Sequence, residues 1–155
     1  MATPERYFED YAAGSISEYG SVAVQTSEIL DFAEQFGPGS WWKERESENG
    51  ASGSSIASEW LVIGIMMRMF AQHFLPGEAS IASPGVEEIR WFKPVRAGDM
   101  LRVRVSVLEA KRSRSKPDRG IVRAFVETFN QDGQLVLSLK SANLFQCRNR
   151  VISSV

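Results

Sequence analysis

Hydrophobic and polar residues alternate with a period of two along most of the second half of the chain. Four segments rich in β-branched and aromatic residues predict strands there: 86–95, 101–110, 120–130 and 134–148. The run Asn130-Gln131-Asp132-Gly133 is typical of a tight hairpin between the last two. In segment 101–110, apolar residues at odd positions alternate with arginines and a serine, which predicts one exposed and one buried face of a sheet.

The first half of the chain predicts one more strand, over residues 15–24, and two helices. The first helix covers 27–36 after a possible N-cap at Thr26, with Ile29, Phe32, Ala33 and Phe36 on one face. The second runs from about 56 to 75, is apolar almost all round and ends at Pro76-Gly77, so we expect it to be buried on most sides. This order predicts an α+β fold, in which an antiparallel sheet closes on one long buried helix.

Length and composition narrow the classes of protein to consider. A chain of 155 residues without repeats or linkers predicts a single domain, 1–155. Eighteen Lys and Arg against nineteen Asp and Glu leave a net charge of −1, which gives no general attraction to nucleic acid or to a membrane. The single cysteine excludes an internal disulfide, and no residue spacing suggests a metal site or a bound cofactor. Since no secretory signal or membrane span is recognisable, we expect a cytoplasmic protein.

Several local strings resemble those of one enzyme family. They are Tyr7-Phe8-Glu9-Asp10 with Gly14, the helix segment 29–36, Leu75-Pro76-Gly77, Ser83-Pro84-Gly85, 92–99 (FKPVRAGD) and 112–117 (RSRSKP). In this order they are similar to the MaoC-like dehydratases, the hot dog fold family of (R)-specific enoyl-CoA hydratases. The resemblance implies a curled sheet wrapped around the long helix, and a homodimer, or a higher oligomer, with its sheets joined edge to edge. It also implies an active site near the start of the long helix, at the dimer interface.

Members of that family add or remove water across the double bond of an acyl thioester, usually of coenzyme A. The resemblance implies an Asp and a His five residues apart as acid–base groups, and a backbone N–H near the start of the long helix as oxyanion donor. In this chain Gly37 stands at the aspartate position and Trp42 at the histidine position. Glu59 replaces the family glycine at the helix start, where a carboxylate repels an oxyanion. The usual dyad is therefore absent.

Glu59 is the candidate catalytic residue that remains. At the apolar start of a buried helix, desolvation favours its neutral form and would make it a usable base. The alternative is a structural carboxylate in the first turn that faces solvent or an arginine. Trp41 and Trp42 either form an aromatic wall of a substrate pocket, to which Ser58 and Trp60 would also belong, or replace side chains that fill the core.

A cluster of basic residues and the only histidine are weaker candidates for a functional role. The cluster Lys111, Arg112, Arg114, Lys116 and Arg119 either holds the phosphates of coenzyme A, through Arg112, Arg114 and Lys116 above all, or is a solvated hairpin. His73, the only histidine, is expected near the end of the long helix, favourably placed against its dipole.

The sequence leaves two functions open. One is an acyl-thioester hydratase or dehydratase in which the family reaction is weak or the pocket has taken another role. The other is a non-catalytic hot dog protein that binds an acyl-CoA, another apolar ligand or a partner subunit.

Overall fold

The computed structural model describes residues 5–36, 56–75 and 77–148. After a short 3-10 turn, η1 (Phe8–Asp10), come strand β1 (Ile16–Ala23) and helix α1 (Thr26–Phe36). Helix α3 (Glu59–His73) follows, and then four strands: β2 (Ser80–Trp91), β3 (Met100–Arg112), β4 (Arg119–Phe129) and β5 (Leu135–Gln146). The predicted order of elements is confirmed, although Gly37 and the tryptophans Trp41 and Trp42 lie outside the described residues.

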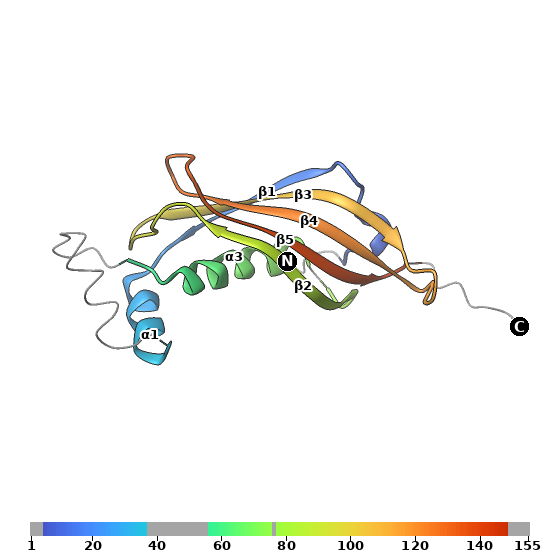
Figure 1. Ribbon diagram of the computed structural model, residues 1–155, viewed down its shortest axis with the longest axis horizontal. Helices are drawn as coiled ribbons and strands as arrows, with labels where there is room; N and C mark the ends of the chain where they lie inside the picture. The colour runs from blue at the N-terminus through green and yellow to red at the C-terminus, as the bar shows by residue number, and fades with distance from the viewer. Residues whose placement is uncertain (1–4, 37–55, 76, 149–155) are drawn as a thin grey trace, which may run out of the picture.

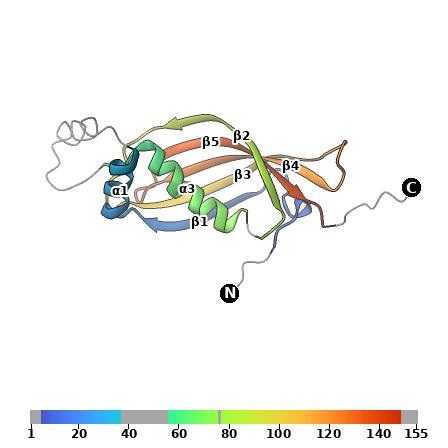
Figure 2. The same ribbon diagram turned by 90° about the horizontal axis from the view of Figure 1, so that it is seen from below.

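All five strands form one antiparallel sheet in the order β1-β3-β4-β5-β2, which curls over α3 (Figures 1 and 2). Strands β3, β4 and β5 are joined by hairpins and pair over most of their length. The predicted turn at Asn130–Gly133 is confirmed by two backbone hydrogen bonds, from the Asn130 N–H to the Gln134 carbonyl and from the Gly133 N–H to the Asn130 carbonyl. Strands β1 and β2 come from distant parts of the sequence and form the two edges of the sheet.

The hydrophobic core lies between α3 and the concave face of the sheet. Odd-numbered β3 residues from Leu101 to Val107 are buried, whereas Arg102 and Arg104 lie on the outer face, as the alternation predicted. On the helix, the buried residues are Leu61, Val62, Ile65, Met66, Met69 and Phe70. The Tyr11 hydroxyl donates a hydrogen bond to the Phe74 carbonyl, which ties the N-terminal segment to the end of the helix.

The long helix is shorter and less enclosed than its sequence predicts. It begins at Glu59 rather than Ile56, because Ser58 is the N-cap and accepts a hydrogen bond from the Trp60 N–H. Its outward face remains exposed in the single chain, with Trp60 62% and Met67 44% exposed. A sequence pattern that is apolar all round does not separate burial inside one chain from burial against another.

The predicted bounds of one strand are wrong. Strand β2 starts at Ser80, six residues before the predicted Val86, and it ends at Trp91 because the chain turns away at Lys93-Pro94. On α1, Ile29 and Ala33 are buried, whereas Phe36 is 69% exposed, with its ring tilted against that of Phe32.

The N-terminal turn η1 is fastened to the far end of the sheet. Its Phe8 ring packs so closely on Gly120 that a Cβ at residue 120 would lie 2.3 Å from ring carbons. Asp10 pairs with the Arg148 guanidinium at 2.6 Å, and Glu9 accepts a hydrogen bond from the Arg148 backbone N–H at 2.8 Å. The hydrogen bond from the Arg148 side chain has the largest effect on Asp10, and the one from the Tyr7 N–H has the next largest. Both hold the pKa of the Asp10 carboxyl below its usual range.

Candidate functional site

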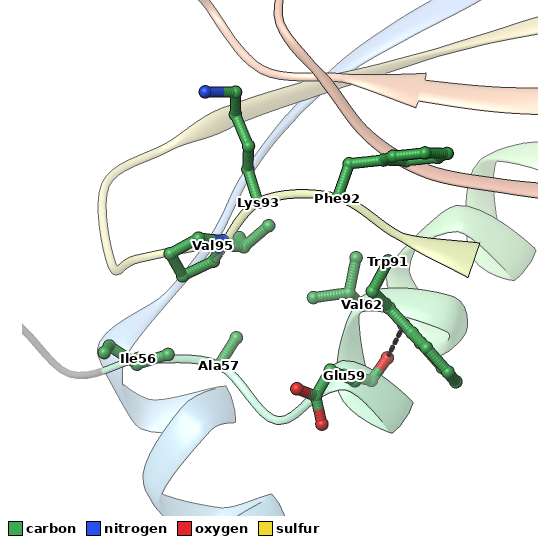
Figure 3. A pocket seen from close by; sticks show the side chains of 9 residues that line it. Ile56, Ala57, Glu59, Val62, Trp91, Phe92, Lys93 and Val95 are labelled. Atoms are coloured by element: carbon green, nitrogen blue, oxygen red, sulfur yellow. Dashed lines mark hydrogen bonds between the residues drawn. The ribbon is translucent and has the colours of Figure 1, made fainter. Parts of the chain in front are cut away.

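A cavity of about 240 Å³ lies where the start of α3 meets the end of β2 (Figure 3). Its lining comes from two short segments of chain: Ile56, Ala57, Glu59 and Val62 on the helix side, and Trp91, Phe92, Lys93, Pro94 and Val95 on the strand side. The floor is apolar, since Ala57, Val62 and Val95 are buried, and the charged groups stand at the rim.

Two hydrogen bonds to backbone carbonyls fix the two sides of this pocket relative to each other. The Ala57 N–H donates to the Val95 carbonyl at 2.8 Å, just before the helix begins. The Trp91 indole N–H donates to the Glu59 carbonyl at 3.0 Å (Figure 3). Together with the Ser58 cap, these bonds hold the first turn of α3 against the strand.

Glu59 is the charged group nearest to the helix start. It is the first residue of α3 and half-buried, and in the view of Figure 3 its carboxylate points away from Trp91, Phe92 and Lys93. The helix N-terminus favours a negative charge at this position. The Glu59 side chain is thus partly accessible to solvent. Its role as a catalytic base, and the structural alternative, stay predictions.

The other residues expected at the site are only partly brought together. Ser58 is used as the helix cap, and Trp60 lies beside the pocket, edge-on against Trp91 with ring centroids 5.6 Å apart. Neither lines the cavity. Gly37, Trp41 and Trp42 lie outside the described residues.

The strand side of the pocket was missed by sequence reasoning. Trp91, Phe92 and Lys93 line the cavity and are exposed. A signal was present for Phe92 and Lys93, because they open the string that resembles the family and the strand pattern breaks at Pro94. The sequence pattern does not show that this break faces the start of the long helix.

The cationic hairpin lies at the opposite end of the sheet from α1 and the start of α3 (Figures 1 and 2). Arg112 pairs with Glu9 at 3.6 Å, and Arg119 pairs with Asp118 at 3.0 Å. Arg114 and Lys116 are exposed at its tip. His73 lies in the last turn of α3, as expected, where its ring stacks on Tyr19 with centroids 5.0 Å apart.

Neither a metal site nor a membrane-spanning helix is found among residues 5–36, 56–75 and 77–148. No three His, Cys, Asp or Glu side chains there are grouped so as to hold a metal ion. None of the helices within those ranges is long and apolar enough to cross a membrane.

Comparisons of the sequence and of the structure with known proteins point to the same fold. No protein-family model matches the chain. Among curated proteins, the uncharacterized protein YdeM of Bacillus subtilis is 24% identical over 139 residues, which cover 85% of this chain and 97% of YdeM. A protein from Mycobacterium tuberculosis described as a double hot dog fold superposes with a TM-score of 0.80 at 16% identity; the match covers 97% of this chain and 47% of that one. That likeness concerns the fold alone.

The MaoC-like dehydratase from Rhodospirillum rubrum carries the assignment further. It is 30% identical to this chain and superposes with a TM-score of 0.79, and the match covers 93% of this chain and 99% of that one. The chain is therefore a member of the MaoC-like dehydratase family and has its hot dog fold.

Proposed function

We propose that this protein binds an acyl thioester, such as an acyl-CoA, in the pocket at the start of α3, and that it hydrates an enoyl thioester weakly or not at all. The observation that carries the proposal is the cavity itself. It has an apolar floor of Ala57, Val62 and Val95, and it opens at the helix terminus where the family resemblance implies the reacting group. An apolar cavity with a few polar groups at its rim is typical of a small-molecule site.

Weak catalysis follows from the residues at the three family positions. Neither Gly37 nor Trp42 has a side chain that can act as a general acid or base near neutral pH. Glu59 brings a negative charge to the helix start, where the thioester oxygen becomes negative during hydration. Binding is therefore retained in the proposal, whereas acid–base catalysis and oxyanion stabilisation are lost.

Calorimetric titration with butyryl-CoA tests the binding proposal. We expect saturable binding to the unmodified protein and its loss in Glu59→Trp, because an indole at this position fills the cavity. Glu59→Gln is the matched control, since it keeps the size of the side chain and removes only its charge. Absence of binding to the unmodified protein would contradict the proposal.

A second candidate is a non-catalytic partner of a dyad-bearing family member. The missing Asp and His favour it, because an inactive chain can still supply half of a shared interface. A pull-down with an active MaoC-like enzyme tests it. Stable co-purification supports this role. If the two proteins do not co-purify, the partner role is wrong and the first candidate, acyl-thioester binding by this chain alone, remains.

A further inference from the structure

The inner end of the pocket at the start of α3 is closed by three apolar side chains. Ala57, Val62 and Val95 line the cavity and are almost completely buried. The side chains of Ala57 and Val62 point into the space between the helix and the strand (Figure 3). All three residues belong to the hydrophobic core, and protein cores are packed as densely as organic crystals. A ligand that enters from the rim therefore ends against packed core.

Backbone hydrogen bonds hold this floor in place. The Ala57 N–H donates to the Val95 carbonyl at 2.8 Å, which joins the helix side of the floor to its strand side. The Val62 N–H donates to the Ser58 carbonyl at 3.1 Å, so Val62 is fixed in the first turn of α3. Moving either side apart would break bonds and open voids in the core, which is costly.

The turn that follows Val95 is fastened from another part of the sheet. The Asp99 carboxylate accepts hydrogen bonds from the Arg96 N–H at 2.9 Å and from the Gln131 side-chain amide at 3.1 Å. The carbonyl oxygen of the same Gln131 side chain accepts a hydrogen bond from the Met100 N–H at 3.0 Å. Gln131 lies in the turn between β4 and β5, so the strand side of the pocket is anchored to that turn. The pocket should therefore keep its size when a ligand enters.

The volume of the cavity limits the length of acyl chain that it can hold. An apolar protein cavity of about 150 Å³ holds one benzene molecule, which is about 25 Å³ for each carbon. The cavity here is about 240 Å³, which at that value has room for roughly ten non-hydrogen atoms. The thioester sulfur and oxygen and the nearest carbons on the thiol side take about four of these places, which leaves about six for acyl carbons.

We infer that the site selects short-chain acyl thioesters, with acyl chains of up to about six carbons, and that Ala57, Val62 and Val95 set this limit. The inference rests on the proposed function and names the class of substrate within it. Each methylene that fits the pocket strengthens binding about fourfold, because it leaves water for an apolar surface. A methylene beyond the limit stays in water or strains the core, so it adds no affinity.

Calorimetric titration with saturated acyl-CoA ligands of different length tests the limit. Butyryl-, hexanoyl- and decanoyl-CoA are identical outside the acyl chain, so differences in affinity report the acyl chain alone. We expect decanoyl-CoA to bind no more tightly than hexanoyl-CoA. A pocket open at its inner end would bind decanoyl-CoA roughly 250-fold more tightly, at about fourfold for each of the four added methylenes. A gain larger than the fourfold of one methylene would overturn the inference.

Two variants of the floor test whether these residues set the limit. Val62→Ala removes two methyl groups and should strengthen the binding of octanoyl-CoA relative to butyryl-CoA by about tenfold. Ala57→Val adds two methyl groups and should weaken the binding of hexanoyl-CoA relative to acetyl-CoA by about tenfold. Ratios between ligands are compared, so a general loss of stability does not affect the result. An unchanged ratio in either variant would overturn the role given to the floor.

Val107→Ala is the matched control for Val62→Ala. Val107 is 4% exposed against 3% for Val62, and it lies on β3 outside the lining of the pocket. The same two methyl groups are lost from the core, so both variants should lose similar stability in urea denaturation. The control should keep the ligand ratios of the unmodified protein. An equal change of the ratios in Val107→Ala would overturn the inference, because a loosened core and not the floor would then decide chain length.

The proposed function and this inference fail in different ways. If butyryl-CoA binds and decanoyl-CoA binds more than fourfold more tightly than hexanoyl-CoA, the length limit is wrong and the proposed function stands. If none of the acyl-CoA ligands binds the unmodified protein, both are overturned.

Discussion

The Trp91 indole N–H donates to the backbone carbonyl of Glu59 at 3.0 Å, which joins the end of β2 to the first residue of α3. This bond crosses between segments 32 residues apart and fixes one side of the pocket against the other. Trp91→Phe keeps most of the ring and removes the donor. We expect a loss of about 1 kcal/mol in the free energy of unfolding, measured by urea denaturation, and weaker acyl-CoA binding. Trp60→Phe on the exposed face is the control, and an equal effect there would contradict a specific role for the bond.

Assembly of two copies of the chain through the exposed face of α3 predicts the mass of the protein in solution. The unmodified protein should scatter light as a dimer of 17.3 kDa chains. Met67→Glu puts a charge into the proposed interface and should shift the mass towards that of a single chain. Leu30→Glu is matched, because Leu30 on α1 is 43% exposed against 44% for Met67. Dissociation by the α1 variant, or none by the α3 variant, would place the interface elsewhere.

The contact between Phe8 and Gly120 should be sensitive to one methyl group. Gly120→Ala forces the Phe8 ring to move, since a Cβ there lies 2.3 Å from it, and we expect about 1–3 kcal/mol of destabilisation. Adding Phe8→Ala removes the clash, so the two changes together should cost less than their sum. Additive losses in a denaturation cycle would show that the ring does not sit on Gly120 in solution.

The ion pair between Asp10 and Arg148 should make stability depend on pH. Its hydrogen bonds lower the pKa of Asp10 in the folded state below the ordinary value of 3.8, so the folded state binds that proton less readily than the unfolded chain. The contribution is therefore complete above that value and is lost as the pH falls through the folded pKa. Asp10→Asn should be less stable than the unmodified protein at neutral pH, and the gap should close in acid. A gap independent of pH would rule out this pairing as its source.

Much of the fold was predictable because its signals are local. The period-two segments, the helix stop at Pro76-Gly77 and the turn at Asn130–Gly133 each specify one element. Strand order was not predictable, since β1 and β2 reach the two edges through contacts with distant segments. The exposed stripe on α3 was read as buried for a related reason: Met67 is as apolar as the core residue Met66, and only the packing distinguishes them.

The residues of the candidate site were likewise predictable only in part. Glu59 was predicted near the helix start because it stands at the position of the family glycine, and the structure places it at the first residue of α3, in the lining of the pocket. Trp91 and Lys93 were not predicted, because no local sequence signal shows that the end of β2 meets the start of α3. The roles of Gly37, Trp41 and Trp42 stay predictions.

The rate of crotonyl-CoA hydration, followed through loss of the enoyl absorbance, tests the central claim most directly. General acid–base groups contribute on the order of 100- to 10,000-fold each, and the family positions here hold Gly37 and Trp42. The unmodified protein should therefore show little or no rate above buffer, while Gly37→Asp, Trp42→His and Glu59→Gly together should raise it and any one alone should not. Turnover by the unmodified protein at an ordinary enzymatic rate, about 10 per second, would contradict the account.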